Sequence, residues 1–427
     1  MVVILYNAVQ PGVRSGLNIL TVGHLMRLTW HFGLGRELGL AFWALTFFEA
    51  SYGSYASVWP LWIERLGAPI TTVGFVLGAA GVVRPFVVGG GSWLTDHIDT
   101  KKLLIGARSL AILGLVIAAF ARSWELLLLT VVTNAVGELV FPVIHSHVTE
   151  HAGNNAARAF NMVITIGPAS ALIVTPFIAG AIIAVFGIPG AILFGALMSA
   201  LGTLCVAIIG FQRHPPSTDA SAPASYRVVL QHTGARNIVI LHGGTVLALA
   251  MGSALIPNFL KDERGLSPEV ISILSAGAAV GTVTFGFISM RNRKLRSAPV
   301  LGAAIATGLT ATGYFLFAIL DVFPAIALAY VLRGGLFSTW ALFLAGMGEI
   351  APRPLRTRAF ALVEILGGSA ISFGPVIASV LYRVEPPLFL IVSGIASYGM
   401  CAVLLWKHGA LARARKAEQD AMLAEIV

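Results

Sequence analysis

The sequence predicts an all-α membrane protein of twelve transmembrane helices, arranged as two pseudo-symmetric six-helix bundles. Three observations lead to this fold class: an apolar composition, a series of apolar runs long enough to cross a bilayer, and a repeat of the first half of the chain in the second. Only 11% of the 427 residues are charged and 57% are hydrophobic. About a quarter of the residues of a soluble domain are charged, so most of this chain must face lipid or other helices.

Twelve apolar runs follow one another along the chain, each long enough to span the hydrocarbon core of a bilayer. They cover approximately residues 38–62, 71–93, 103–121, 124–144, 161–183, 188–211, 237–259, 269–290, 299–318, 322–345, 359–381 and 387–406. These runs divide the chain into an N-terminal segment, a first bundle, a linker rich in Pro, Ser and Ala, a second bundle and a tail. The corresponding boundaries are 1–36, 37–211, 212–236, 237–406 and 407–427. Met26 is an alternative start.

Two stretches of the chain, 200 residues apart, are versions of one another. Arg158 and Arg358 each open an apolar run with the same tripeptide, Arg-Ala-Phe. Both runs continue through a matching glycine to a proline, and Pro176 and Pro375 differ by a slip of one residue. A period near half the chain length indicates a duplicated unit. In a chain this apolar, duplicated halves are typical of a transporter with its site between them.

The Lys and Arg residues gather on one side of the membrane when both termini are placed in the cytoplasm. Twenty fall on the cytoplasmic side, five fall outside, and three lie within runs, at Arg84, Arg108 and Arg333. This bias follows the positive-inside rule. The net charge of +9 is therefore topogenic and does not indicate a nucleic-acid partner. We expect a multi-pass protein of a bacterial inner membrane, in contact with lipid, for which a monomer suffices.

Motifs for catalysis and cofactor binding do not stand out. Cys205 and Cys401 fall at matching places within apolar runs, so they predict neither a disulfide framework nor a metal cluster. The sequence has no P-loop, which disfavours ATP-driven pumping. It has no evident nucleophile–base pair either. We therefore expect neither an enzyme nor a cofactor.

The loop after the second run carries the most specific local pattern. It contains Gly91 and Asp96, with Lys101 and Lys102 behind them. Together with the six-plus-six runs and the central linker, this loop resembles the signature of the major facilitator superfamily, over about residues 37–406. The resemblance implies two six-helix bundles related by an axis along the membrane normal, and transport by alternating access.

The same loop is predicted to form a conformational latch. Asp96 should end a helix at the cytoplasmic face, opposite the N-terminus of the eleventh run. A carboxylate near N-terminal helix amides is favoured by about 0.3–1 kcal/mol. That contact exists only when the cytoplasmic side is closed, so Gly91, Asp96, Lys101 and Lys102 would bias one of two states. The alternative is a solvated acidic loop.

Two charged residues in the first two runs lie at comparable depth in the membrane. A charge at the bilayer centre costs at least about 2.5–3.5 kcal/mol, so each of them should have a partner or a function that offsets this cost. Glu49 and Arg84 are predicted to pair, either within a coupling site or as a static structural pair. Tyr52 and Tyr55 follow Glu49 at near-helical spacing. They are predicted to line a cavity, with packing or anchoring at the membrane interface as the alternative.

Four further polar residues complete the candidate coupling set. Arg333 lies in the tenth run and Glu138 in the fourth. Arg333 is predicted to hold an anionic substrate or to set the protonation of Glu138. The alternative is that Arg333 pairs with a carboxylate such as Glu364. A desolvated Glu364 is a candidate proton carrier. His242 is expected to be a satisfied interhelical histidine rather than a proton relay. Arg108 is expected to snorkel to the cytoplasmic interface and has no predicted role.

A histidine-rich segment lies between the fourth and fifth runs. Its imidazole and carboxylate side chains suit a first-row divalent ion such as iron, zinc or manganese. The residues are His145, His147, Glu150 and His151. They follow no fixed-spacing motif, and histidines at a helix C-terminus also interact favourably with the helix dipole. Metal binding is therefore an alternative.

These residues together predict a secondary active transporter that moves a small solute by alternating access, coupled to protons. Glu49, Arg84, Glu138, Arg333 and Glu364 would form its polar midplane. Two alternatives stay open. One is a divalent metal transporter that uses the histidine-rich segment, and the other is a sensor or assembly protein that uses this fold without transport.

Overall fold

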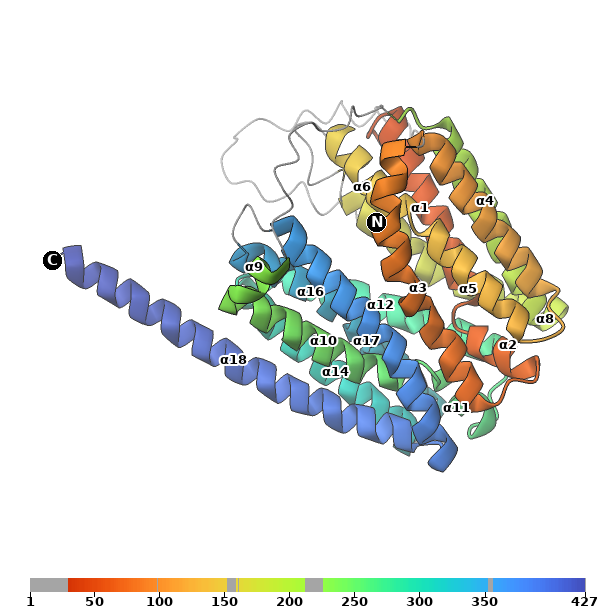
Figure 1. Ribbon diagram of the computed structural model, residues 1–427. Helices are drawn as coiled ribbons and strands as arrows, with labels where there is room; N and C mark the ends of the chain where they lie inside the picture. The colour runs from red at the N-terminus through yellow and green to blue at the C-terminus, as the bar shows by residue number, and fades with distance from the viewer. Residues whose placement is uncertain are drawn as a thin grey trace, which may run out of the picture.

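The computed structural model describes residues 30–97, 99–151, 159, 161–211, 226–351 and 356–426. Within these ranges every regular element is a helix. Eight of the described helical segments are long and apolar enough to cross a membrane (Figure 1). The prediction of an all-α membrane protein is confirmed, whereas the count of twelve spans and the grouping into two six-helix bundles stay predictions.

The first half of the chain supplies eight described elements and the second half supplies ten. The first eight are α1 (Arg36–Tyr55), α2 (Trp59–Arg65), α3 (Ile70–His97), α4 (Thr100–Ala119), α5 (Glu125–Gly137), α6 (Val140–His151), the π-helix η4 (Asn161–Ile166) and α8 (Gly167–Ile208). The others are α9 (Tyr226–Gln231), α10 (Thr233–Ser253), α11 (Ile256–Asp262), α12 (Pro268–Arg291), α13 (Arg293–Arg296), α14 (Pro299–Ile319), α15 (Phe323–Arg333), α16 (Gly335–Ile350), α17 (Arg356–Val384) and α18 (Leu388–Ile426).

Two of these helices differ in extent from the predicted runs. α8 contains most of the fifth and sixth runs, which meet at Gly187 without a loop, and the start of the fifth run forms η4. Gly187 has φ 70°, a region that favours glycine, and it reverses the chain between the two helical stretches. α18 continues past the predicted boundary at residue 406 as one helix, and its C-terminal part extends away from the other helices (Figure 1).

Four predicted runs are kinked. Short interruptions separate α1 from α2, α5 from α6, α10 from α11 and α15 from α16, which are the first, fourth, seventh and tenth runs. α2 and α11 each begin with a proline at the second position, Pro60 and Pro257. Glu138 and Gly334 lie at the other two interruptions with helical φ values of −68° and −56°, so the chain bends there without turning back. The same runs are therefore kinked in both halves.

The buried core shows how the two halves meet. We call the end of the molecule that carries α2 and α11 the outer end, and the opposite end, with α6 and α9, the inner end (Figure 1). At the outer end a single apolar cluster joins residues of both halves, among them Trp62 and Ile192 with Phe259 and Tyr330. At the inner end the described core residues form two separate clusters, one in each half.

Helix pairs of small residues join the halves near the outer end. α3 packs along α17, where Gly74 and Gly78 face Pro375 and Ser372 so closely that a Cβ on either glycine would lie 2.5 Å from a backbone oxygen. α8 packs along α12, and Ser272 Oγ donates a hydrogen bond to the carbonyl of Pro176 at 3.1 Å. Small residues allow such close helix approach within a membrane.

Candidate functional site

An acidic group lies in the middle of the first half. Glu49 of α1 is half-buried, and it lies within electrostatic range of Arg108 on α4 and of Glu138, which follows the last residue of α5. Tyr55, two turns after Glu49, is influenced by the same three charges. The ring of Tyr52 lies 6.2 Å from that of Tyr55. Three helices therefore bring two carboxylates, one guanidinium and two phenols together.

Arg108 is the cation of this group, and its surroundings contradict the expectation that it snorkels. Its side chain is only 7% exposed. Nη1 donates to the carbonyl of Gly137 at 3.3 Å, and Nη2 donates to Ser199 Oγ at 3.1 Å. The guanidinium carbon lies 3.6 Å from the centroid of the Phe48 ring. The side chain turns inward because the kink after α5 offers a carbonyl and the aromatic face offers a cation–π contact.

Arg333 is the last residue of α15 and is only partly buried. Its guanidinium lies 5.9 Å from the centroid of the Tyr330 ring and influences Tyr314 and Tyr52 electrostatically. Within the described part of the chain, this guanidinium makes no hydrogen bond and no ion pair with a carboxylate. It is a cation that aromatic side chains surround and that no described acid neutralises.

Tyr52 links the two groups of charges. It belongs to α1, yet it lies within electrostatic range of Arg333 in the second half as well as of Glu49 and Glu138 in the first. Its side chain is 51% exposed. Tyr52 therefore lies among charged groups of both halves with about half of its surface exposed.

The kink beside Arg333 is held by threonines and close backbone packing. Thr282 Oγ1 on α12 donates to the carbonyl of Gly334 at 2.9 Å, and Thr310 Oγ1 on α14 donates to that of Leu332 at 3.2 Å. A Cβ on Gly281 would clash with the carbonyl oxygen of Val331. Each hydroxyl shares its single proton with a carbonyl of its own helix, that of Ala278 at 2.9 Å and that of Ala306 at 3.0 Å, so the carbonyls at this kink have hydroxyl donors within reach without the arginine.

Glu364 and His242 lie together, away from Arg333. Trp340 Nε1 donates to Glu364 Oε1 at 2.9 Å, so the alternative in which Glu364 pairs with Arg333 is not what the structure has. The buried His242 ring packs edge-on against the rings of Trp340 and Phe343, 4.8 Å and 5.1 Å away between centroids. It is interhelical as expected, but neither ring nitrogen has a hydrogen-bond partner among the described residues.

Several predicted residues have side chains outside the part that the structure describes. These are Arg84, Gly91, Asp96 and Glu150. The predicted Glu49–Arg84 pair and the latch therefore stay predictions. Lys101 and Lys102 are described at the start of α4, where Asp99 Oδ1 accepts a hydrogen bond from the backbone N–H of Lys102 at 3.1 Å. Asp99 thus caps the helix.

The histidines of α6 are divided between environments. His145 is exposed, whereas His147 is buried with Nε2 3.8 Å from Glu37 Oε2 on α1. The rings of His147 and His151 lie 4.0 Å apart. Among the described residues, no group of three His, Cys, Asp or Glu side chains could hold a metal ion. The side chain of Glu150 is not described, so the metal alternative stays untested.

A polar cluster at the outer end, which the sequence did not predict, connects the halves. Glu64 on α2 accepts hydrogen bonds from Asn258 Nδ2 at 2.8 Å and from Lys261 Nζ at 3.0 Å, both on α11. Lys261 also lies 3.4 Å from Asp262, which accepts a 2.9 Å hydrogen bond from the Tyr382 hydroxyl on α17. Glu64 and Lys261 are the second-last residues of matching short helices in the two halves.

The helices are long and apolar enough to span a membrane, and the two halves share a core at the outer end. Charged side chains of both halves lie around Tyr52. These features define a multi-pass helical membrane protein. The family sequence model of the Major Facilitator Superfamily matches residues 41–375, which is well over half of the chain. The protein therefore belongs to this family. The resemblance inferred from the loop after the second run is confirmed. No curated protein matches the sequence.

Solved transporters share this fold at low sequence identity. A POT family transporter in complex with 5-aminolevulinic acid superposes with a TM-score of 0.71 at 13% identity, covering 88% of this chain and 96% of its own. A second POT structure, in complex with a thioalcohol-conjugated peptide, gives 0.69 at 15% identity, with 87% and 95% covered. The nucleoside transporter NupG gives 0.64 at 14% identity, with 87% and 98% covered. At these identities the similarity concerns the fold alone.

Proposed function

We propose that this protein is a secondary transporter that moves a small solute bearing an anionic group by alternating access, coupled to protons. The observation that carries the proposal is the position of Tyr52, within electrostatic range of Arg333 on one side and of Glu49 and Glu138 on the other. A site between two halves, with opposite charges on its two walls, suits a solute that must be held by both halves.

Arg333 would bind the anionic group of the solute. A guanidinium at membrane depth is costly unless a counter-charge or a water-filled space accompanies it. No described carboxylate pairs with it, while the backbone carbonyls beside it already have threonine donors. An entering carboxylate or phosphate would find a planar donor fork available for a bidentate contact. Tyr52 would lie beside the bound solute.

The acidic group would supply proton coupling. Glu49, Glu138 and Arg108 carry a net charge of −1 when all three are ionised, and one proton makes the group neutral. A proton bound at Glu49 or Glu138 changes the field at Tyr52, because this side chain is influenced by both carboxylates. Glu364, which Trp340 binds, would be a second protonation site nearer the inner end.

Alternating access would use two bundles, residues 37–211 and 237–406, each with six spans. The shared core at the outer end and the separate cores at the inner end suit a state that is open toward the inner side. The lysine and arginine distribution predicts that this side is the cytoplasm. The opposite state would require the Glu64–Lys261 contact to open while the predicted latch at Asp96 closes.

Two of the solved relatives hold ligands, an organic acid and a peptide conjugate, and a third is a nucleoside transporter. An organic acid agrees best with an unneutralised Arg333, so we infer that the solute is a small organic anion.

Flux through proteoliposomes tests this proposal. We expect a thermal-shift screen of the purified protein to find a stabilising organic anion, and neutral analogues of that anion to give no shift. The anion should exchange across proteoliposomes that contain the wild-type protein. Arg333→Ala should lose both the shift and the exchange, while the exposed outer-loop variant Arg122→Ala retains them. Binding without flux would instead favour the sensor alternative, and stabilisation by divalent metal alone would favour the metal alternative.

Coupling is tested separately with a pH gradient. An inward proton gradient should drive accumulation by the wild-type protein. In Glu49→Gln we expect exchange to persist without gradient-driven accumulation, because the carboxylate that takes up the proton is gone. Accumulation that is unchanged in both Glu49→Gln and Glu138→Gln would exclude this acidic group as the coupling site.

A further inference from the structure

An exposed phenylalanine lies beside Arg333 on the tenth run. Phe337 is four residues after Arg333, and the chain stays helical through Gly334, so the two side chains leave the same side of the run. Phe337 is 51% exposed, and Ala341, one turn further along α16, is exposed as well. Between Gly335 and Gly348 this helix contains no charged residue. An apolar surface with one exposed ring therefore follows directly after the guanidinium.

This surface is turned toward the first half of the molecule. α16 packs against α10, α12, α14 and α17, which all belong to the second half. Arg333, on the same side of the run as Phe337, influences Tyr52 of α1 in the first half electrostatically. The Tyr52 side chain is also 51% exposed. Two half-exposed aromatic side chains, one from each half, thus accompany the arginine.

The polar side chains of α16 are engaged or buried on its other sides. Ser338 and Thr339 are 6% and 0% exposed. The indole N–H of Trp340 donates to Glu364. A polyhydroxylated solute would therefore leave its hydroxyl groups without partners against Phe337, which costs free energy, whereas an apolar ring has no such groups.

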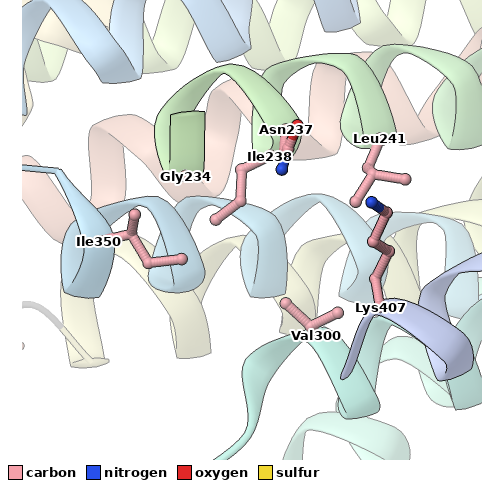
Figure 2. A pocket seen from close by; sticks show the side chains of 7 residues that line it. All are labelled: Gly234, Asn237, Ile238, Leu241, Val300, Ile350 and Lys407. Carbon is pink, nitrogen blue, oxygen red and sulfur yellow. The ribbon is translucent and has the colours of Figure 1, made fainter. Parts of the chain in front are cut away.

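A second space beside α16 does not suit such a solute. A cavity of about 200 Å³ lies near the inner end, where Ile350 of α16 lines it together with residues of α10, α14 and α18 (Figure 2). Its described lining contains Lys407 but neither an arginine nor an aromatic side chain. The surface formed by Arg333 and Phe337 is separate from this cavity, and it combines a guanidinium with an exposed ring.

We propose that the organic anion of the proposed function, on which this inference rests, is an aromatic carboxylate. Its carboxylate would contact Arg333 and its ring would contact Phe337. Residues four apart on a helix have Cβ atoms about 5–6 Å apart, so a short spacer between carboxylate and ring suits this pair. Two aromatic rings in an offset or edge-to-face contact contribute more than the apolar area that they bury. Phe337 would thus determine specificity, while Arg333 supplies the charge and Tyr52 borders the ring from the first half.

The test compares two carboxylates of equal charge, phenylacetate and its saturated analogue cyclohexylacetate. Isothermal titration of the intact, detergent-purified protein measures both dissociation constants. We expect the wild-type protein to bind phenylacetate roughly 2- to 10-fold more tightly, the range that an aromatic pair contributes. Phe337→Leu should lose this preference and still bind cyclohexylacetate, because it keeps apolar surface without a ring. Phe337→Ala should lose the preference and bind both acids more weakly.

Phe373→Ala is the matched control. Phe373 of α17 is 60% exposed and lies nine residues after Glu364. Because this separation is about two and a half helical turns, Phe373 lies on the opposite side of α17 from Glu364. Its removal should change neither dissociation constant.

Three results would overturn the proposal. The first is equal binding of the two acids by the wild-type protein, or binding of aliphatic anions alone. The second is a preference for phenylacetate that both Phe337 variants retain, and the third is an equal loss of this preference in Phe373→Ala. Failure of the proposed function gives a different result, in which no organic anion binds or Arg333→Ala binds both acids as tightly as the wild type. If Phe337→Ala does not purify as a single species, Phe337→Leu gives the same readout.

Discussion

Each half of the molecule has an arginine beside a kinked span, and the two arginines have opposite surroundings. Arg108 supplies the hydrogen bond that the kink between α5 and α6 needs, through the carbonyl of Gly137, and it is stacked on Phe48. At the kink between α15 and α16 threonines donate those hydrogen bonds, and Arg333 makes none with the described residues. In this molecule the arginine that the kink does not engage is the one whose guanidinium could contact a ligand.

Removal of the first arginine should have the largest effect on stability. Arg108→Ala would leave Glu49 and Glu138 without this guanidinium, and breaking a buried charge cluster typically costs about 3–5 kcal/mol. We expect a large loss of monodisperse protein and a lower melting temperature in detergent. Arg333→Ala is the matched control and should melt close to the wild type. An equal loss of stability in the two variants would break the comparison.

Removal of the second arginine should mainly affect ligand binding. A hydrogen bond to a charged group contributes about 1.5–3 kcal/mol, so Arg333→Ala should bind the organic anion roughly 10- to 150-fold more weakly. Isothermal titration of the purified variant measures this affinity. Arg333→Lys should recover part of it, since the charge remains while the bidentate fork is lost. Unchanged affinity in Arg333→Ala would show that the anion contacts another cation.

The close packing around the second kink can be tested with two glycines of α12. Gly281→Ala places a methyl group against the carbonyl of Val331, and such overpacking typically costs about 1–3 kcal/mol. Gly286→Ala, one and a half turns further along the same helix, meets no atom within 4 Å and should be neutral or stabilising. The difference in melting temperature between the two variants measures the packing. Equal melting temperatures would mean that the kink tolerates movement of α12.

The smallest effect is expected from the threonine at the kink. Thr282→Val removes the hydroxyl that donates to the carbonyl of Gly334, a loss of about 1 kcal/mol. The carbonyl of Gly334 then keeps only the longer hydrogen bonds from Ser338, at 3.4 Å from Oγ and 3.5 Å from the backbone N–H, so Arg333 should turn toward it and the affinity for the anion should fall as well. Thr307→Val is the control, because the Thr307 hydroxyl bonds only to Ala303 within its own helix. Thr282→Val with full affinity would show that Arg333 does not depend on this threonine.

The helical membrane class could be predicted because hydropathy and run length report directly on the need to satisfy the backbone in lipid. The kinks could not be predicted from the same pattern, since a bent span is as apolar as a straight one. Two signals were nevertheless present. Pro60 and Pro257 take the second position of α2 and α11, where proline favours a helix start.

The candidate site could be predicted only in part. Glu49, Glu138, Tyr52 and Arg333 stood out because each is a polar residue in an apolar run. The role of Arg108 could not be predicted from its depth along the helix, because the direction of its side chain depends on Phe48 and Ser199 from distant parts of the sequence. Charge type and depth identify candidates, whereas their partners depend on how the helices pack.

The single-residue connection at Gly187 has a mechanical consequence. Two membrane-spanning stretches of α8 are joined there with no slack, at a backbone angle that other residues strain to adopt. In the proposed alternating-access movement, a tilt of one arm of this hairpin would carry the other arm with it, and both would move against α12. For the same reason, a spectroscopic label or an epitope tag inserted at this turn would disturb the movement it was meant to report.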